Sequence, residues 1–113
     1  MGKGDSLGDL ELLVLLAVLR LGDDAYGLNV RREIAAHAER DVAIGAVYSA
    51  LDRMERKGLV TSWSSEPTGE PGGRSRRCFR VERSGRIAVE RALRTIDALR
   101  KHLSIHPQRG TAR

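Results

Sequence analysis

The sequence predicts a mainly α-helical fold that carries one small β-hairpin. Four segments place apolar residues at the three- and four-residue spacing of a helix, and two short segments rich in β-branched or aromatic residues flank a loop rich in Pro and Gly. With 113 residues, the chain is long enough for one modest hydrophobic core. We therefore expect a single domain.

The first helix is expected to begin after Ser6, because Ser6 and Asp9 have the spacing of a capping box. Residues 10–19 are apolar almost all round, which indicates a helix buried on several sides. Gly22 should end this helix. Residues 1–6 are expected to form a flexible N-terminus.

The second helix is expected over residues 25–38, with Asp23 or Asp24 as its cap. Residues 40–44 are too few for a further helix and predict a brief strand. The apolar stripe of the second helix should face the first helix and consists of Leu28, Ile34, Ala35 and Ala38.

The third helix is expected to open at Gly45 and to end at Gly58, a residue type that commonly caps the C-terminal end of a helix. Its buried face has helical spacing and consists of Val47, Leu51 and Met54. The opposite face begins with small and polar side chains and continues with basic ones: Ala46, Ser49, Asp52, Arg53 and Arg56.

Residues 59–64 and 77–81 predict the two strands of the hairpin, because the first is rich in β-branched and aromatic residues and the second alternates Phe79 and Val81 with polar or basic neighbours. Between them, residues 66–74 have the Pro and Gly density of a long exposed loop, which we call the wing. Cys78 is expected to be a small residue in the second strand. Its arginine neighbours leave open a redox-sensitive thiol, since positive charge favours the thiolate.

Residues 84–103 predict a fourth helix, whose start is left open because Ser84 or Glu82 could serve as its N-cap. Apolar residues recur along it at alternating spacings of three and four, as in a coiled-coil seam. Such a helix needs a partner, either the chain's own first helix or the same helix of a second copy. We assign residues 83–104 to dimerisation and residues 105–113 to a disordered tail. The seam consists of Val89, Ala92, Leu93, Ile96, Leu99 and Leu103.

Charge and composition favour a nucleic-acid partner. The net charge is +5, and the segment 74–94 carries eight Arg against two Glu. The longest apolar run, residues 12–19, is much shorter than the roughly 20 residues that cross a bilayer, and no signal peptide is visible, so we expect a cytoplasmic protein without a membrane partner. One Cys and three separated His predict no metal site, and we expect no cofactor.

The order helix, helix, short strand, helix, hairpin, helix predicts a winged helix-turn-helix over residues 7–82, followed by the C-terminal dimerisation helix. In such a fold one helix enters the major groove of duplex DNA, and the hairpin loop reaches the backbone or the minor groove. The small residues Gly45, Ala46 and Ser49 should permit close approach to the bases. Arg53 and Arg56 are expected to contact phosphates. Phosphate or minor-groove contacts are expected from Arg74, Arg76 and Arg77.

The sequence resembles the PadR family of transcriptional regulators. The resemblance rests on residues 10–17, the triplet Ala25-Tyr26-Gly27, residues 45–60, Gly72-Gly73-Arg74 in the wing, and Gly85-Arg86 at the fourth helix. It implies a bacterial regulator, usually a repressor, that dimerises through its last helix together with its first. The resemblance further implies a pseudo-palindromic operator and, in many members, release from DNA by a small aromatic effector.

The resemblance also bears on two tyrosines. Tyr26 and Tyr48 match recurrent tyrosines of the family that support the DNA-binding face. For Tyr48, direct DNA contact and a place at the core edge both remain open. The chain has Glu82 where the family commonly has Thr, and its short C-terminal region places any effector at a dimer interface, where Trp63 is the only indole.

The sequence disfavours three other functions. Winged helices also serve as protein-interaction adaptors without sequence-specific DNA binding, but the basic wing argues against that role. RNA recognition is poorly supported because the few aromatic residues do not cluster. An enzyme is not expected, because no phosphate-binding loop, metal pattern or nucleophile motif is present.

Overall fold

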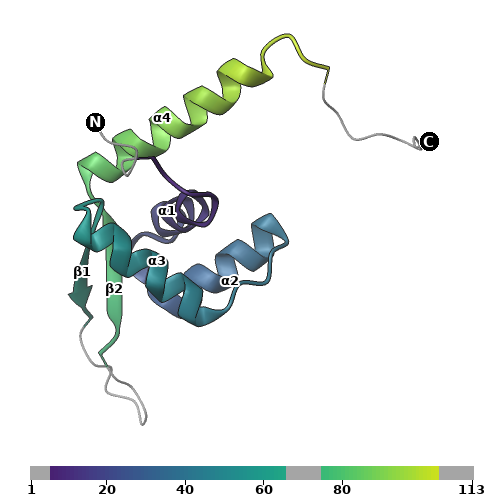
Figure 1. Cartoon of the computed structure of the whole chain (residues 1–113). Coiled ribbons are helices and arrows are strands. Elements are labelled where there is room, and N and C mark those ends of the chain that lie inside the picture. Colours follow the sequence, from purple (N-terminus) through teal and green to yellow (C-terminus); the bar gives the residue numbers. More distant parts are fainter. Residues whose placement is uncertain (1–5, 66–74, 105–113) are drawn as a thin grey trace.

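The computed structural model describes residues 6–65 and 75–104. Within these ranges it consists of four α-helices, a short 3-10 turn and a two-stranded hairpin (Figure 1), which confirms the predicted fold class. No helix in this part of the chain is long and apolar enough to cross a membrane. In chain order the elements are α1 (Asp9–Leu21), η2 (Gly22–Asp24), α2 (Gly27–Ala38), α3 (Ile44–Arg56), β1 (Val60–Ser64), β2 (Arg77–Val81) and α4 (Arg83–Arg100).

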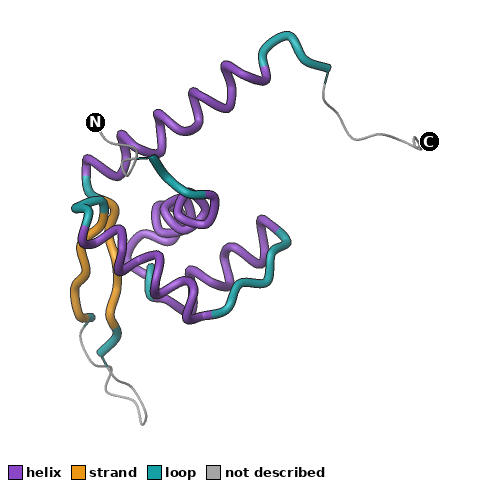
Figure 2. Tube along the Cα trace, viewed as in Figure 1, coloured by secondary structure: helices purple, strands orange, loops and turns teal. Residues whose placement is uncertain are grey.

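The core lies among α1, α2, α3 and the inner face of the hairpin. The predicted buried face of α3 is confirmed, because Val47, Leu51 and Met54 are fully buried. From the hairpin, Phe79 is also fully buried. Figure 2 shows the hairpin beside α3, while α4 crosses above α1 and continues away from the other helices.

The first helix begins differently from the prediction. Gly8 is the N-cap of α1, and its backbone N–H donates to Oε1 of Glu11 at 2.9 Å. The predicted pair Ser6 and Asp9 is therefore wrong as a cap. Asp9 instead forms an ion pair with Arg40, with 2.5 Å between Oδ2 and Nη1. Gly22 ends the helix as predicted, with a φ of 60°.

The second helix begins at Gly27 and not at residue 25, because Ala25 and Tyr26 are held in extended backbone beside β2. The backbone N–H of Phe79 donates to the carbonyl oxygen of Ala25 at 2.8 Å, and Tyr26 forms a β-bridge with Cys78. Tertiary pairing thus overrides the predicted Asp cap, and both Asp23 and Asp24 lie in η2.

The buried face of α2 also differs from the prediction. Ile34 is buried as expected, but Leu28, Ala35 and Ala38 are exposed, and Val30 takes their place in the core. Val30 and Ile34 are four residues apart and share one face of the helix.

The brief strand predicted at residues 40–44 is wrong. This stretch is an extended loop up to Ala43, and α3 already begins at Ile44. The loop is fixed by a side chain of α2, because Nε of Arg31 donates to the carbonyl oxygen of Val42 at 2.7 Å. The carbonyl group of Val42 therefore accepts its hydrogen bond from a side chain and not from a neighbouring strand.

The end of α3 confirms the predicted glycine cap. Gly58 has a φ of 78°, a conformation that glycine adopts readily. The N–H of Leu59 donates to the carbonyl of Met54 at 2.9 Å, and the N–H of Gly58 donates to that of Glu55 at 3.0 Å. This is a Schellman arrangement, and it turns the chain directly into β1.

The fourth helix begins at Arg83, with Glu82 in the N-cap position but without a capping bond from its side chain. Ser84 is not a cap either, because its hydroxyl donates to the carbonyl of Gly58 at 2.7 Å. The helix ends at Arg100, so the predicted extension to Leu103 is wrong. Val89 is buried against the core.

Candidate nucleic-acid interface

The first turns of α3 form an open surface of small side chains. Gly45 and Ser49 are exposed, and Ala46 is half-buried. A Cβ atom added at Gly45 would meet no other atom within 4 Å. The structure therefore leaves this end of α3 open to close approach by another molecule, and base reading by these residues remains a prediction.

Tyr48 fixes α3 against the start of α2. A Cβ atom added at Gly27 would lie 2.3 Å from Cζ of Tyr48, so the phenol ring rests directly on the glycine backbone. Tyr48 is half-buried and packs against the core. Of the two roles left open for Tyr48, the structure shows the packing role, and direct DNA contact remains a prediction.

The side chain of Arg76 stacks on the ring of Tyr26. The guanidinium carbon of Arg76 lies 4.4 Å from the centre of the Tyr26 ring, within the range of a cation–π interaction. The backbone N–H of Arg76 donates to Oγ of Ser65 at 2.9 Å, which closes the hairpin just before the wing. Arg76 thus remains exposed but has a defined position.

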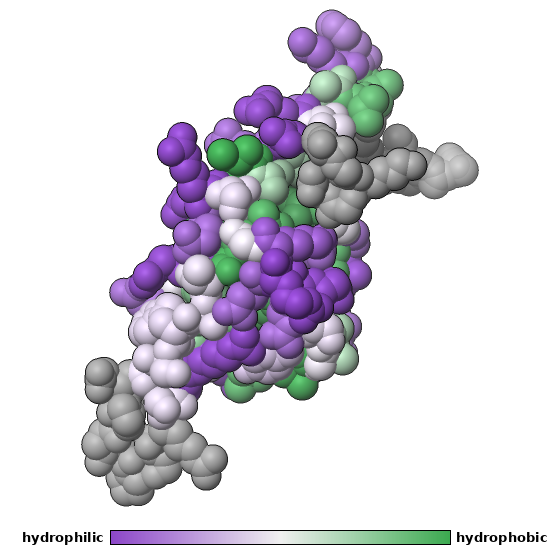
Figure 3. Space-filling view, turned by 60° about the vertical axis from the view of Figure 1, so that its left-hand side comes forward, coloured by the Kyte–Doolittle hydropathy of each residue, from purple (hydrophilic) through white to green (hydrophobic). Residues whose placement is uncertain are grey.

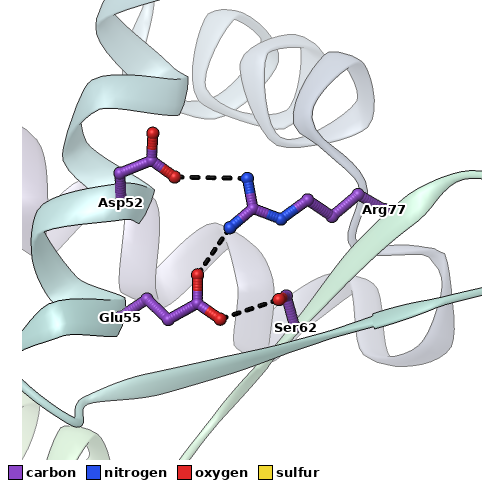
Figure 4. Close-up of polar contacts among 4 residues, drawn as sticks. All are labelled: Asp52, Glu55, Ser62 and Arg77. Atoms are coloured by element: carbon purple, nitrogen blue, oxygen red, sulfur yellow. Dashed lines mark hydrogen bonds and ion pairs between the residues drawn. The ribbon is translucent and has the colours of Figure 1, made fainter.

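Arg77 points to the opposite side of the hairpin, toward α3. Its Nη1 lies 3.2 Å from Oδ1 of Asp52, and its Nη2 lies 2.5 Å from Oε1 of Glu55 (Figure 4). The other carboxylate oxygen of Glu55 accepts a hydrogen bond from Ser62 of β1 at 2.7 Å. The guanidinium also stacks 4.8 Å from the centre of the Phe79 ring.

Arg53 and Lys57 both face a buried carboxylate of α1. Oε2 of Glu11 lies 3.3 Å from Nε of Arg53 and 3.7 Å from Nζ of Lys57. Burial by itself would raise the pKa of Glu11, but the Gly8 N–H and the two cations outweigh it and lower the pKa. Glu11 is therefore a charged anchor between α1 and the C-terminal half of α3.

Arg56 and Arg74 are two further residues for which the sequence predicts contact with DNA. Arg56 is exposed, and no ion pair involves it among the described residues. Arg74 belongs to the wing and lies outside the described residues. DNA contact by either residue remains a prediction.

Cys78 is buried in β2, as expected for a small packed residue. Burial, followed by the charge of Asp24, raises the pKa of its thiol, although Arg76 acts in the opposite direction. Arg76 therefore favours the thiolate as expected, but burial and Asp24 outweigh it, so the net shift of the pKa is against a reactive thiolate.

The predicted dimerisation residues fall into two groups. Val89 is buried and Ala92 half-buried within the chain, whereas the remaining four apolar residues of the seam are exposed. Figure 3 shows hydrophobic surface near the upper end of the molecule, where the last turns of α4 lie. The four exposed residues are Leu93, Ile96, Leu99 and Leu103.

Sequence reasoning missed the acidic partners of this surface. Asp52 and Glu55 are three residues apart, which places them on one face of α3, but nothing in the sequence points to Arg77 as their partner. The sequence does offer a sign that Glu11 has a cationic partner, because Glu11 is the one charged residue within the apolar segment from residue 10 to residue 19.

Comparisons with known proteins agree with this geometry. The family model described as "Transcriptional regulator PadR-like family" matches residues 15–91, more than half of the chain. No curated protein matches this chain.

Several solved structures have the same fold. A PadR family transcription regulator from hypervirulent Clostridium difficile R20291 is 25% identical, with a TM-score of 0.66 over 82% of this chain and 95% of that chain. A transcriptional regulator from Clostridium thermocellum is 20% identical, with a TM-score of 0.67 over 81% of this chain and 86% of that chain. A PadR family regulator from Eggerthella lenta is 22% identical, with a TM-score of 0.62 over 80% of this chain and 79% of that chain.

The family match, the order of the elements and the open start of α3 beside an arginine-bearing hairpin agree on one class of protein. The chain belongs to the PadR-like family and is a transcriptional regulator of the DNA-binding type, not an enzyme.

Proposed function

We propose that this regulator represses transcription by binding a pseudo-palindromic operator as a homodimer. In this proposal the first turns of α3 enter the major groove, and the hairpin reaches the adjacent backbone or minor groove. The observation that carries it is the exposed, small-residue surface at Gly45 and Ser49, which lets the helix backbone approach base edges. Arg56, Arg76 and the wing residue Arg74 supply phosphate or minor-groove contacts.

The proposed dimer is supported by the exposed side of α4. Two apolar residues of α4, Ile96 and Leu99, and Leu103 just after the helix are between 47% and 75% exposed, which is costly for a single chain in water. The outer face of α1 offers half-buried Leu12, Leu13 and Leu16 as matching surface. If α4 and α1 of one copy pack against α4 and α1 of a second copy, the apolar surfaces of both helices are covered.

A two-fold dimer makes a prediction about the operator. The two α3 helices would read half-sites related by the same two-fold axis, with centres one helical turn of DNA apart, about 10 base pairs, or a multiple of it. The operator should therefore be an inverted repeat.

An effector, in this proposal, binds next to the dimer contacts. A cleft of about 480 Å³ lies between the start of α1 and α4, lined by Leu12 and Ile96 among others. It is large enough for a small aromatic molecule, and its occupation would change how α4 packs.

The salt dependence of binding tests whether the exposed arginines contact phosphates. Replacing both Arg56 and Arg76 with Ala should weaken binding to every duplex and reduce the slope of log K against log salt by about 1.8, because each lost phosphate contact accounts for about 0.9. A control variant with Arg83 and Arg94 of α4 replaced by Ala should keep the slope. Equal slopes in both variants would remove these arginines from the interface, and no duplex binding at low salt would favour the adaptor role instead.

A further inference from the structure

Arg76 and Arg77 are neighbours in sequence and chemically identical, but the structure gives them different surroundings. Arg76 lies over an aromatic ring with no acidic partner among the described residues. Arg77 lies between two carboxylates, those of Asp52 and Glu55. We infer that Arg77 is a positioning residue that sets the angle of the hairpin strands β1 and β2 relative to α3, and that it does not act as a phosphate ligand. This inference rests on the proposed DNA-binding function.

The contacts of Arg77 join three separate elements. Asp52 and Glu55 belong to α3, Arg77 begins β2, and Ser62 lies in β1. Glu55 uses one oxygen for Arg77 and the other for Ser62, so a single carboxylate of α3 holds both strands of the hairpin. We call these four side chains the brace.

The geometry of the brace suits arginine better than lysine. The planar guanidinium presents two nitrogens in a fixed fork, and here each nitrogen faces a different carboxylate. Its flat face also lies against Phe79, a fully buried core residue. A lysine would keep the positive charge but could satisfy neither the fork nor the stacking.

The position of the brace links it to the selectivity of the protein for one DNA sequence over another. Arg77 pairs with Ser64 in the last pair of the hairpin, at the end where residues 65–76 connect β1 to β2. Asp52 and Glu55 lie on the helix that reads the bases. Holding these two parts at one angle fixes which base pairs and which phosphates are contacted together, and a loose hairpin would contact any duplex.

The charge count also separates Arg77 from a phosphate ligand. Two carboxylates surround its one positive charge, so the local charge is −1 and a phosphate gains nothing from approaching it. To bind a phosphate, Arg77 would have to leave both partners and expose their charges to the DNA.

The test measures affinity for a duplex selected from a random pool and for a scrambled duplex of equal composition, as a function of salt. Arg77→Lys should reduce the ratio of the two affinities at least tenfold while the salt slope stays unchanged. Arg80→Lys is the matched control, because Arg80 lies on the same strand but on the opposite face, over Trp63. It should leave the ratio unchanged.

A second variant removes the carboxylates and keeps Arg77. Asp52→Asn with Glu55→Gln should reduce the affinity ratio by a similar factor, because the brace is lost. If both affinities rise equally and the salt slope steepens, Arg77 is a phosphate ligand and the inference is wrong.

Two other outcomes are equally decisive. An unchanged ratio in Arg77→Lys, with a reduced ratio in the carboxylate variant, would show that the carboxylates read bases directly and would also overturn the brace. If the wild-type protein binds no duplex, the proposed function itself fails. Circular dichroism of each variant checks that it is folded.

Discussion

Gly85 lies in the first turn of α4, where that helix touches the turn between α3 and β1. A Cβ atom added at Gly85 would lie 2.4 Å from the carbonyl oxygen of Leu59 and 2.7 Å from Cγ1 of Val81. The first of these atoms belongs to the backbone and cannot swing away. At the scale of single residues, this contact sets how closely α4 approaches the rest of the molecule.

We expect Gly85→Ala to lower the free energy of unfolding by about 1–3 kcal/mol, the usual cost of forcing an extra methyl group into a packed site. Urea denaturation measures this change. Gly45→Ala is the control, because Gly45 also lies in a helix but a Cβ atom there meets no atom within 4 Å. That variant should be neutral or more stable by up to about 1 kcal/mol. Equal stabilities for the two variants would contradict the close approach at Gly85.

Glu11 predicts a pH dependence of stability. Its pKa is lowered from the ordinary value of 4.5 in the folded protein, since the Gly8 N–H, Arg53 and Lys57 outweigh the effect of burial. A lowered folded pKa means that its stabilising contribution is fully present above about pH 4.5 and is lost as the pH falls through the folded value.

We therefore expect Glu11→Gln to cost about 1–3 kcal/mol of unfolding free energy at pH 7, in the range of hydrogen bonds to buried charged groups. The difference from the wild-type protein should shrink as the pH falls below about 4.5. Denaturation at several pH values between 3 and 7 checks this. A difference that is constant over that range would show that the carboxylate charge plays no part.

The arginines show what the sequence could predict about the site at this scale. Their number and clustering predicted a basic surface, because composition is enough for that. The sequence does not show which arginine is neutralised, since Arg53 meets Glu11 across 42 residues and Arg77 meets Asp52 across 25. Such partners are brought together only by the fold.

At the scale of elements, the sequence predicted the type of every helix and strand that has a strong pattern. β2 was predicted with the bounds that the structure has, because Phe79 and Val81 alternate with polar or basic neighbours over the whole segment. The start of α2 and the segment from residue 40 to residue 44 were wrong for one reason. Their backbones are fixed by partners distant in the sequence, namely β2 and Arg31, and not by local propensity.

The end of α2 contains a residue in an unfavourable conformation. Glu39 is the C-cap of the helix and has a φ of 52° and a ψ of 43°, the left-handed region that costs most residues about 1 kcal/mol. We expect Glu39→Gly to raise the free energy of unfolding by up to about 1 kcal/mol, measured by thermal or urea denaturation. Asn at this position should give part of the gain. A loss of stability in both variants would contradict the left-handed conformation.

At the scale of the whole molecule, α4 decides the proposed assembly. Replacing Ile96 and Leu99 with Asp should produce monomers in sedimentation or light-scattering measurements, because two charges would lie in the apolar contact between copies. The control variant Arg94→Gln with Ala98→Asp changes the net charge by the same amount on the opposite side of the helix, and it should remain a dimer. A dimer that survives the first variant would place the interface elsewhere.

A single measurement tests both dimerisation and DNA binding: the selection of bound duplexes from a random pool by the wild-type protein. We predict enrichment of an inverted repeat with half-site centres about 10 base pairs apart, or a multiple of that spacing, bound by two copies of the chain and weakened steeply by salt. Enrichment of a single asymmetric site bound by one copy would contradict the dimeric operator complex. A pool that shows no enrichment even at low salt would contradict sequence-specific DNA binding altogether.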